Sequence, residues 1–189
     1  MFPNRQKLNM NGVWLFIPDH ENKGEESQWY LNPPFDKGVE ISLPLIEPIC
    51  DIKDSTSLWF VKEFDVESLQ DDILLLLHLQ NVNFKSVIWL NGQYVGIHEG
   101  AFTKFHFNIT RYVQKGKNLL VIKVSPFPWQ NLLKFTTIYD LSWVQFPGIW
   151  GEIYIEFTPR YYIQNIQVKP DIRGKRIVTN VYVNHKDCV

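Results

Sequence analysis

The feature that most constrains this chain is a series of short strand-like segments separated by turn residues, and Ser86–Ile97 is the clearest of them. In this segment apolar and aromatic residues flank the pair Asn91-Gly92 on both sides. A two-residue hairpin turn needs positive φ at both central positions, and Asn-Gly tolerates that conformation best. The sequence therefore predicts two antiparallel strands joined by a tight turn.

Strand signals of the same kind recur along the chain, while helical periodicity is scarce. Because Ile73–Leu79 is apolar on both parities, we expect both of its faces to be covered. Gly151–Phe157 alternates apolar with polar residues, which predicts a half-buried strand with one wet side. Further strands are expected over Leu58–Val66, Lys104–Ile109 and Asn118–Ser125. The pattern favours an antiparallel sandwich or barrel over a parallel α/β sheet.

Composition excludes several classes of function. The 189 residues carry a net charge of −1 with scattered basic residues, so no footprint for nucleic acid is present. The longest apolar run is too short to span a bilayer, and the first residues lack the apolar core of a signal peptide. The protein is therefore expected to be soluble, either cytoplasmic or periplasmic or secreted with a leader removed. Cys50 and Cys188 suggest neither a disulfide framework nor a zinc site. No metal or cofactor is expected.

The stretch Pro126–Pro147 differs from the rest because it is long, aromatic and weakly periodic. Ordered loops of this length are often functional. The alternative, a loop that only packs its aromatic side chains over the sandwich, stays equally open. After Pro159 the pattern restarts with two strands, Tyr162–Val168 and Ile177–Val183, joined by a turn at Gly174. Because two strands alone are marginally stable, we expect them to open a second, incomplete domain.

Several motifs in a fixed order resemble the sugar-binding domain of family 2 glycoside hydrolases, the group of β-galactosidase, β-glucuronidase and β-mannosidase types. The resemblance covers about residues 8–157. Its motifs are Leu8–Phe16, Leu58–Phe64, Val87–Gly96, His98–Phe102, Phe105–Thr110, Gly116–Val124, Pro147–Trp150 and Ile153–Ile155. The chain departs from the usual pattern at Ala101, Lys104 and Gly151, which puts the substrate in question.

The resemblance implies an all-β fold, a galactose-binding-like antiparallel jelly-roll β-sandwich over residues 1–159. It also implies that residues 160–189 are the first strands of an immunoglobulin-like sandwich. In whole family members a (β/α)₈ barrel follows and holds both carboxylates of a retaining hydrolase. Catalytic residues are accordingly expected outside this chain, which should be inactive by itself and should brace the barrel.

The long loop holds the residues for which the resemblance suggests contact with a sugar. An aspartate or neighbouring residue before the Gly-Ile signature reaches the sugar in related enzymes, and here Asp140 and Ser142 are the candidates. A carboxylate accepts directional hydrogen bonds from sugar hydroxyls. Trp129 and Trp143 could stack on a pyranose ring. For each of the four residues a purely structural role stays open.

Other features have plainer interpretations. Glu99 has no identifiable carboxylate partner and is expected on the surface, and Asn108-Ile109-Thr110 is expected to serve a turn rather than glycosylation. The expected partners are carbohydrate and the catalytic barrel of the same chain, with a homo-oligomer left open. Two rival functions remain, a free-standing carbohydrate-binding module and a structural or protein-interaction sandwich.

Overall fold

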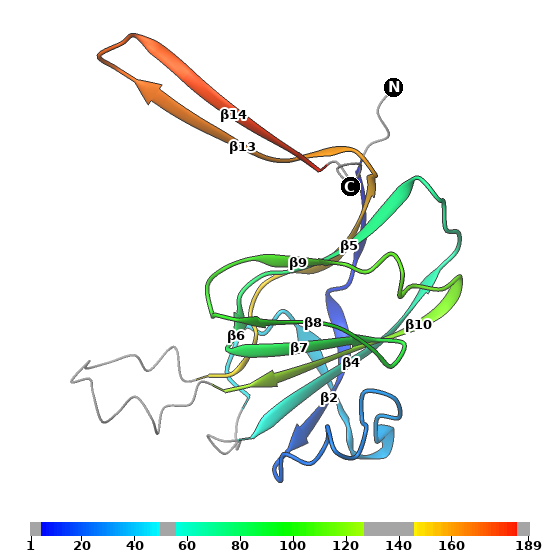
Figure 1. The fold of residues 1–189 in the computed structure, drawn as a ribbon. Helices are drawn as coiled ribbons and strands as arrows, with labels where there is room; N and C mark the ends of the chain where they lie inside the picture. Colours follow the sequence, from blue (N-terminus) through cyan, green and yellow to red (C-terminus); the bar gives the residue numbers. More distant parts are fainter. Residues whose placement is uncertain (1–4, 50–55, 127–145, 185–189) are drawn as a thin grey trace, which may run out of the picture.

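The computed structural model describes residues 5–49, 56–126 and 146–184, and within these ranges the chain forms antiparallel strands and a short 3-10 helix, η1 (Phe35–Lys37). Two sheets pack face to face (Figure 1). In spatial order the first contains β1 (Gln6–Asn9), β12 (Ile153–Pro159), β5 (Ile73–Leu79) and β9 (Phe105–Asn108). The second contains β3 (Val39–Leu43), β2 (Gly12–Asp19), β4 (Ser57–Val66), β10 (Gly116–Ser125), β7 (Lys85–Leu90) and β8 (Gln93–Glu99).

The order of strands shows long-range crossovers, since β12 lies between β1 and β5, and β10 lies between β4 and β7. Every pairing in the two sheets is antiparallel. The expected all-β, antiparallel jelly-roll sandwich of galactose-binding-like type is therefore confirmed. Such crossovers are typical of jelly rolls, in which sequential strands alternate between two packed sheets.

The main core lies between the sheets and is built from alternate residues of each strand. On β12 Ile153 and Ile155 are fully buried, and on β10 Leu120, Ile122 and Val124 are fully buried. Each such side chain stabilises the fold by about 1.5–3 kcal/mol through its removal from water. The apolar run of β5 is buried at Leu74–Leu77 and Leu79, so the expectation that both its faces are covered holds except at Ile73 and His78, which are partly exposed.

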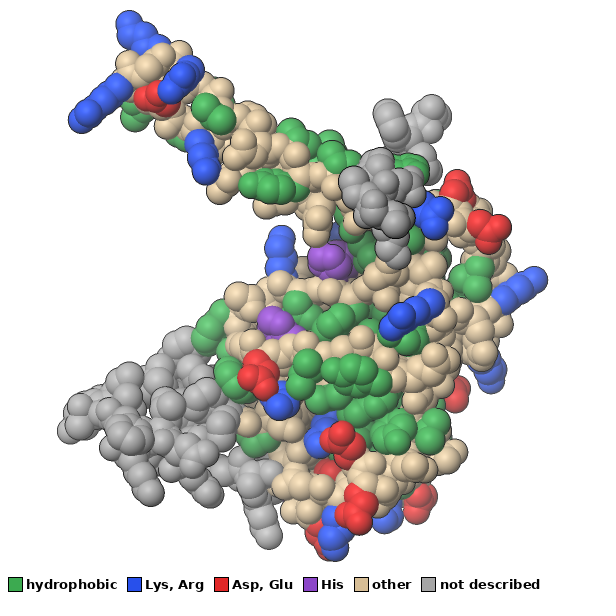
Figure 2. All heavy atoms as spheres, viewed as in Figure 1, with side chains coloured by type: hydrophobic (Ala, Val, Ile, Leu, Met, Phe, Trp, Pro, Cys, Tyr) green, Lys and Arg blue, Asp and Glu red, His purple; other side chains and the backbone are tan. Residues whose placement is uncertain are grey.

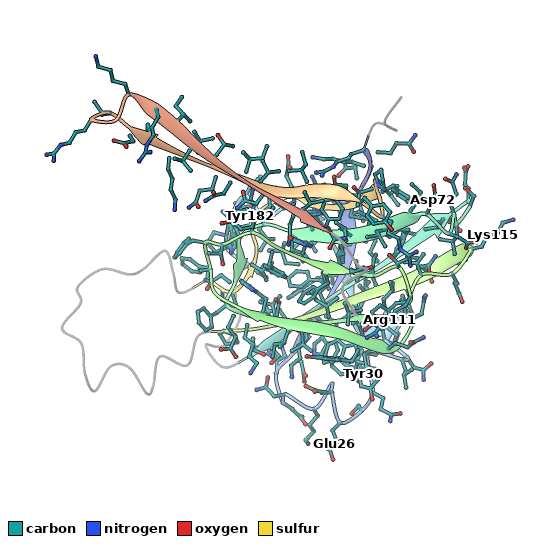
Figure 3. The ribbon with its side chains drawn as sticks, turned by 45° about the horizontal axis from the view of Figure 1, so that its top comes forward. Glu26, Tyr30, Asp72, Arg111, Lys115 and Tyr182 are labelled. Atoms are coloured by element: carbon teal, nitrogen blue, oxygen red, sulfur yellow. The ribbon has the colours of Figure 1, made fainter. Side chains whose placement is uncertain are left out.

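A second, smaller core lies on the outer face of the six-stranded sheet. Trp59 and Trp89 stack there with ring centroids 5.4 Å apart. A cap segment, residues 20–38, covers them, and its Tyr30 stacks on Trp89 at 5.3 Å. Figure 3 labels Glu26 and Tyr30 on this segment. The Trp side chains are thus buried as core residues.

Asp19 fixes the start of the cap segment. Its carboxylate is buried and accepts hydrogen bonds from the backbone N–H of Lys23 (3.0 Å) and Gly24 (2.8 Å) and from Nε1 of Trp59 (3.1 Å). A buried carboxylate is tolerated when donors satisfy its oxygens in this way. One side chain therefore joins the sheet, the turn after β2 and the outer aromatic core.

The tight turn predicted between β7 and β8 is confirmed. Asn91 and Gly92 both have positive φ, 51° and 75°. Oδ1 of Asn91 also accepts the backbone N–H of Leu119, and its Nδ2 donates to Asn118. A Cβ added at Gly92 would collide with the side chain of Leu31. The Asn-Gly pair is therefore required by its tertiary contacts as well as by the turn conformation.

The other predicted strands are present, with ends shifted by up to three residues. The expected Asn118–Ser125 begins at Gly116, and the two strands after Pro159 extend as β13 (Tyr162–Asp171) and β14 (Arg176–Asn184). The sequence assigned no strand to β1, β2 or β3, nor to the two-residue β6 (Val82–Asn83) and β11 (Gly148–Ile149). These strands are short, lie at an edge or, in β2, contain Pro18, so their local signals are weak.

Strands β13 and β14 form a hairpin that projects from the sandwich (Figure 1). The register places aliphatic residues together on one face, and mainly polar residues, with Val178 and Tyr182, on the other. The apolar face contains Ile163, Ile166, Val168, Ile177, Val181 and Val183, all exposed. Within the described residues no second sheet covers this face.

Candidate functional site

The candidate site is the sandwich edge where the long aromatic loop leaves and returns, and we call it the loop edge (residues 82–84, 98–103, 125–126 and 146–150). Strand β10 ends there at Ser125, whose carbonyl accepts the backbone N–H of Phe84 at 3.3 Å. The carbonyl of Phe84 in turn accepts the N–H of Gly100 at 3.2 Å. Three segments far apart in the sequence are therefore linked at this edge.

The returning end of the loop is held by two side-chain donors. Nδ2 of Asn83 and Nε1 of Trp150 both donate to the carbonyl of Phe146, at 2.8 and 3.2 Å. Gly148 follows at φ 146°, and a Cβ there would collide with Leu45. The Gly-Ile motif thus needs a glycine for conformation and for packing, and it pairs with β6 as β11.

His98 lies beside the same edge in a partly apolar setting. Its ring stacks on Phe105 with centroids 3.8 Å apart, and its Nε2 lies 3.2 Å from Oγ1 of Thr103. Burial lowers the pKa of His98, and the neighbouring Glu99 carboxylate opposes that shift. The ring is therefore a neutral hydrogen-bonding group at neutral pH.

Glu99 has the surface role that the sequence predicts. Its carboxylate pairs with Nζ of Lys85 at 3.0 Å, and its side chain is 55% exposed. An exposed pair of this kind contributes little to stability. Asn108 and Thr110 likewise bond to each other, Oγ1 to Oδ1 at 2.7 Å, which fits the expected turn role.

The four sequence-predicted substrate-contacting residues, Asp140, Ser142, Trp143 and Trp129, lie outside the described residues, as do Cys50 and Cys188. What the structure provides is the base of their loop. Both ends are fixed next to His98 and Trp150 by the hydrogen bonds above. Loops that carry function are commonly positioned by a scaffold of this kind.

Sequence reasoning missed a polar cluster on the outer face of the four-stranded sheet. The carboxylate of Glu156 is buried and contacts Nη1 of Arg5 at 3.2 Å and Nε2 of His78 at 2.9 Å. Burial lowers the pKa of His78, against the opposing pull of Glu156. The wet face of β12 was foreseen, but only the strand register brings His78 and Arg5 beside it.

Residues 5–49, 56–126 and 146–184 hold no group of three His, Cys, Asp or Glu side chains that could bind a metal ion. The same residues form no helix that is long and apolar enough to cross a membrane.

The two-sheet jelly roll and its loop edge define a β-sandwich of the galactose-binding-like class. Residues 30–159 match the sequence profile described as "Glycosyl hydrolases family 2, sugar binding domain", and the chain belongs to this family. The match includes the loop edge, the Asn-Gly hairpin and most of both sheets. The resemblance found in the sequence is therefore confirmed.

Related proteins agree with this assignment. The chain is 26% identical to "Beta-glucuronidase" of Rattus norvegicus, over 96% of this chain and 33% of the relative. It is also 26% identical to "Beta-galactosidase large subunit" of Leuconostoc lactis, over 77% of this chain and 22% of the relative. The chain thus spans at most about a third of these relatives.

Solved structures show the same fold. A β-glucuronidase from Ruminococcus gnavus in complex with D-glucuronic acid superposes with a TM-score of 0.78 at 16% identity, covering 98% of this chain and 36% of that one. A β-glucuronidase from an uncultured Clostridium species gives a TM-score of 0.75 at 21% identity, covering 97% of this chain and 34% of that one.

Proposed function

We propose that this chain is the non-catalytic N-terminal part of a retaining β-glycosidase that acts on β-glucuronides or β-galactosides. One observation carries the proposal: the family match covers residues 30–159, and the alignments to glucuronidases cover nearly the whole chain but only about a third of those relatives. Retaining hydrolysis needs two carboxyl groups about 5–5.5 Å apart on a scaffold that holds a sugar between them. We assign both to a barrel outside residues 1–189.

The proposed role of the sandwich is to brace that barrel and to contribute the loop at residues 126–147 to the rim of the sugar site. The hydrogen bonds at both ends of the loop support this role. The Ser125 carbonyl accepts from Phe84 at one end, and the Phe146 carbonyl accepts from Asn83 and Trp150 at the other. Asp140 and Ser142 are the proposed hydrogen-bonding residues, and Trp129 and Trp143 the proposed stacking residues. Carbohydrate and the parent's barrel are the proposed partners.

The proposed domain boundary lies at residue 159, with residues 160–189 opening an immunoglobulin-like sandwich. The exposed apolar face of the β13–β14 hairpin supports this assignment, because its six aliphatic side chains are on one face and about half exposed. A sheet with one apolar face is stable only when another layer covers it, and a two-stranded hairpin by itself is marginal.

The test compares the 189-residue chain with its full-length parent on nitrophenyl β-glucuronide, β-galactoside and β-mannoside. We expect the chain to release no nitrophenol above the blank, and the parent to hydrolyse one of the first two substrates with retention at the anomeric carbon, read by proton NMR. Turnover by the short chain, or a parent that inverts configuration, contradicts the proposal. Asp140→Ala in the parent is expected to lower kcat/KM, with Asp72→Ala as the matched control.

A further inference from the structure

A cleft of about 790 Å³ lies between the outer face of the four-stranded sheet and the β13–β14 hairpin. Figure 2 shows this hollow opening beneath the hairpin, with a histidine side chain at its inner end. Its volume is within the usual range for small-molecule sites, about 300–1,000 Å³.

The floor of the cleft is a row of rings contributed by three neighbouring strands. Tyr154, His78 and His106 are directly opposite one another in the register of β12, β5 and β9. The ring of His78 stacks on Tyr154 at 4.6 Å and on His106 at 5.1 Å. Because the rings use their faces against each other, the row offers polar edges to a ligand: the phenol hydroxyl of Tyr154 and the exposed imidazole of His106, while Nε2 of His78 is buried against Glu156.

The charge of the lining is positive. Arg5, Lys7 and Lys104 line the cleft, and Glu156 is the single carboxylate among the lining residues. Glu156 is already engaged by Arg5, which also donates to the carbonyl of Ile163 at 2.9 Å. Lys7 lies over the ring of Tyr154 at 4.2 Å, and the described residues provide no ion pair for Lys7 or Lys104. Two ammonium groups are thus left to bind anions.

The opposite wall of the cleft comes from the polar face of the hairpin. Gln164, Asn165 and Tyr182 line it, and Asn165 is opposite Tyr182 in the register. Figure 3 shows Tyr182 at the end of the hairpin that lies closest to the sandwich. Amide and phenol groups both donate and accept hydrogen bonds, as ligands rich in hydroxyl groups require.

We propose that this cleft binds an oligosaccharide that carries carboxylate groups. The ammonium groups of Lys7 and Lys104, which have no ion pair within the described residues, bind the carboxylates, and the ring edges and hairpin amides bind the hydroxyls. An acidic peptide is the alternative ligand, because Tyr154, Tyr162 and Tyr182 also line the cleft and could anchor side chains, and the polyglutamate comparison below distinguishes it. The site belongs to the sandwich and hairpin and is separate from hydrolysis by the parent.

The test titrates the 189-residue chain with trigalacturonate by calorimetry at low salt. We expect measurable binding that weakens as salt rises, since exposed charges are screened. Lys7→Gln combined with Lys104→Gln is expected to lower the affinity at least about tenfold, the equivalent of about 1.4 kcal/mol. The matched control is Lys115→Gln combined with Lys117→Gln, two exposed lysines away from the cleft, which should leave binding unchanged (Figure 3 labels Lys115).

Three results would overturn the proposal: no binding of trigalacturonate, equal binding of its neutral methyl ester, or equal binding of polyglutamate of the same charge. Equal losses in the two double variants would also overturn it, because they would show nonspecific attraction. The substituted lysines are exposed, so the variants are expected to fold, which circular dichroism checks. A parent that is inactive on nitrophenyl glycosides would contradict the proposed function but would not change the binding results. The two proposals can therefore be tested independently.

Discussion

The sandwich and the hairpin are built from the same alternation of apolar and polar residues, yet their apolar side chains have opposite exposures. Ile155 on β12 is 0% exposed, whereas Ile166 on β13 is 52% exposed. Both strands pair in antiparallel register with a neighbour. The difference is that β12 faces a second sheet and β13 does not. Alternation therefore defines a face, and only a second layer converts that face into a core.

The largest expected effect comes from making the same substitution in both regions. Ile155→Ala should lower the free energy of unfolding by about 2–5 kcal/mol, because it removes buried methyl groups and leaves a cavity. Ile166→Ala should lower it by less than about 1 kcal/mol. Urea denaturation followed by tryptophan fluorescence measures both. Similar losses for the two variants would show that the apolar face of the hairpin is already buried in solution.

A second matched pair compares the carboxylates that organise a turn in each region. Asp19→Ala should cost about 2 kcal/mol, because it leaves the buried donors at Gly24 and Trp59 without an acceptor. Asp171→Ala, in the turn of the hairpin, removes solvent-exposed hydrogen bonds to Gly174 and Arg176. It should lower the free energy of unfolding by well under about 1 kcal/mol. Thermal denaturation followed by circular dichroism measures the stability of both variants. A larger loss for Asp171→Ala than for Asp19→Ala would contradict the assigned role of Asp19.

The smallest expected effect is a pH dependence confined to the sandwich. Burial lowers the pKa of His78 below its ordinary 6.5, with Glu156 opposing the shift and His106 and Lys7 adding to it. The unfolded chain therefore takes up this proton at a higher pH than the folded chain. The free energy of unfolding should therefore fall as the pH drops below about 6.5. At higher pH His78 is neutral in both states and contributes no pH dependence.

The His78→Gln variant isolates the pH dependence that His78 carries, because other histidines, including His98, stay in place. We expect a shallower loss of stability between pH 7 and pH 5 in this variant than in the unmodified chain, measured by urea denaturation at each pH. Parallel curves for the two proteins would show that His78 does not carry the dependence. The described part of the hairpin contains no histidine and should add nothing to it.

Local sequence pattern was sufficient to predict the elements whose turn residues or alternation lie within a few residues. The Asn91-Gly92 turn, the β5 run and the alternation on β12 could each be read from a few residues. The loop at Pro126–Pro147 stood out by its composition, and the family resemblance suggested its role. The edge that holds it was not predicted, since Phe84, Gly100 and Phe146 meet through crossovers that no local signal encodes. The polar cleft was missed altogether, because Arg5, His78 and Glu156 come from three segments that are distant in the chain.

The sequence by itself determined the all-β class, most strand positions and the family, because alternation, turn residues and motif order are local or linear properties. Only the tertiary structure decided which strands are neighbours, which alternating faces are covered and which charges meet. Those outcomes depend on crossovers and on sheet-on-sheet packing, where one register brings His78 beside Tyr154 and Glu156. Contacts between distant segments are fixed by the burial of whole layers, which no short stretch of sequence records.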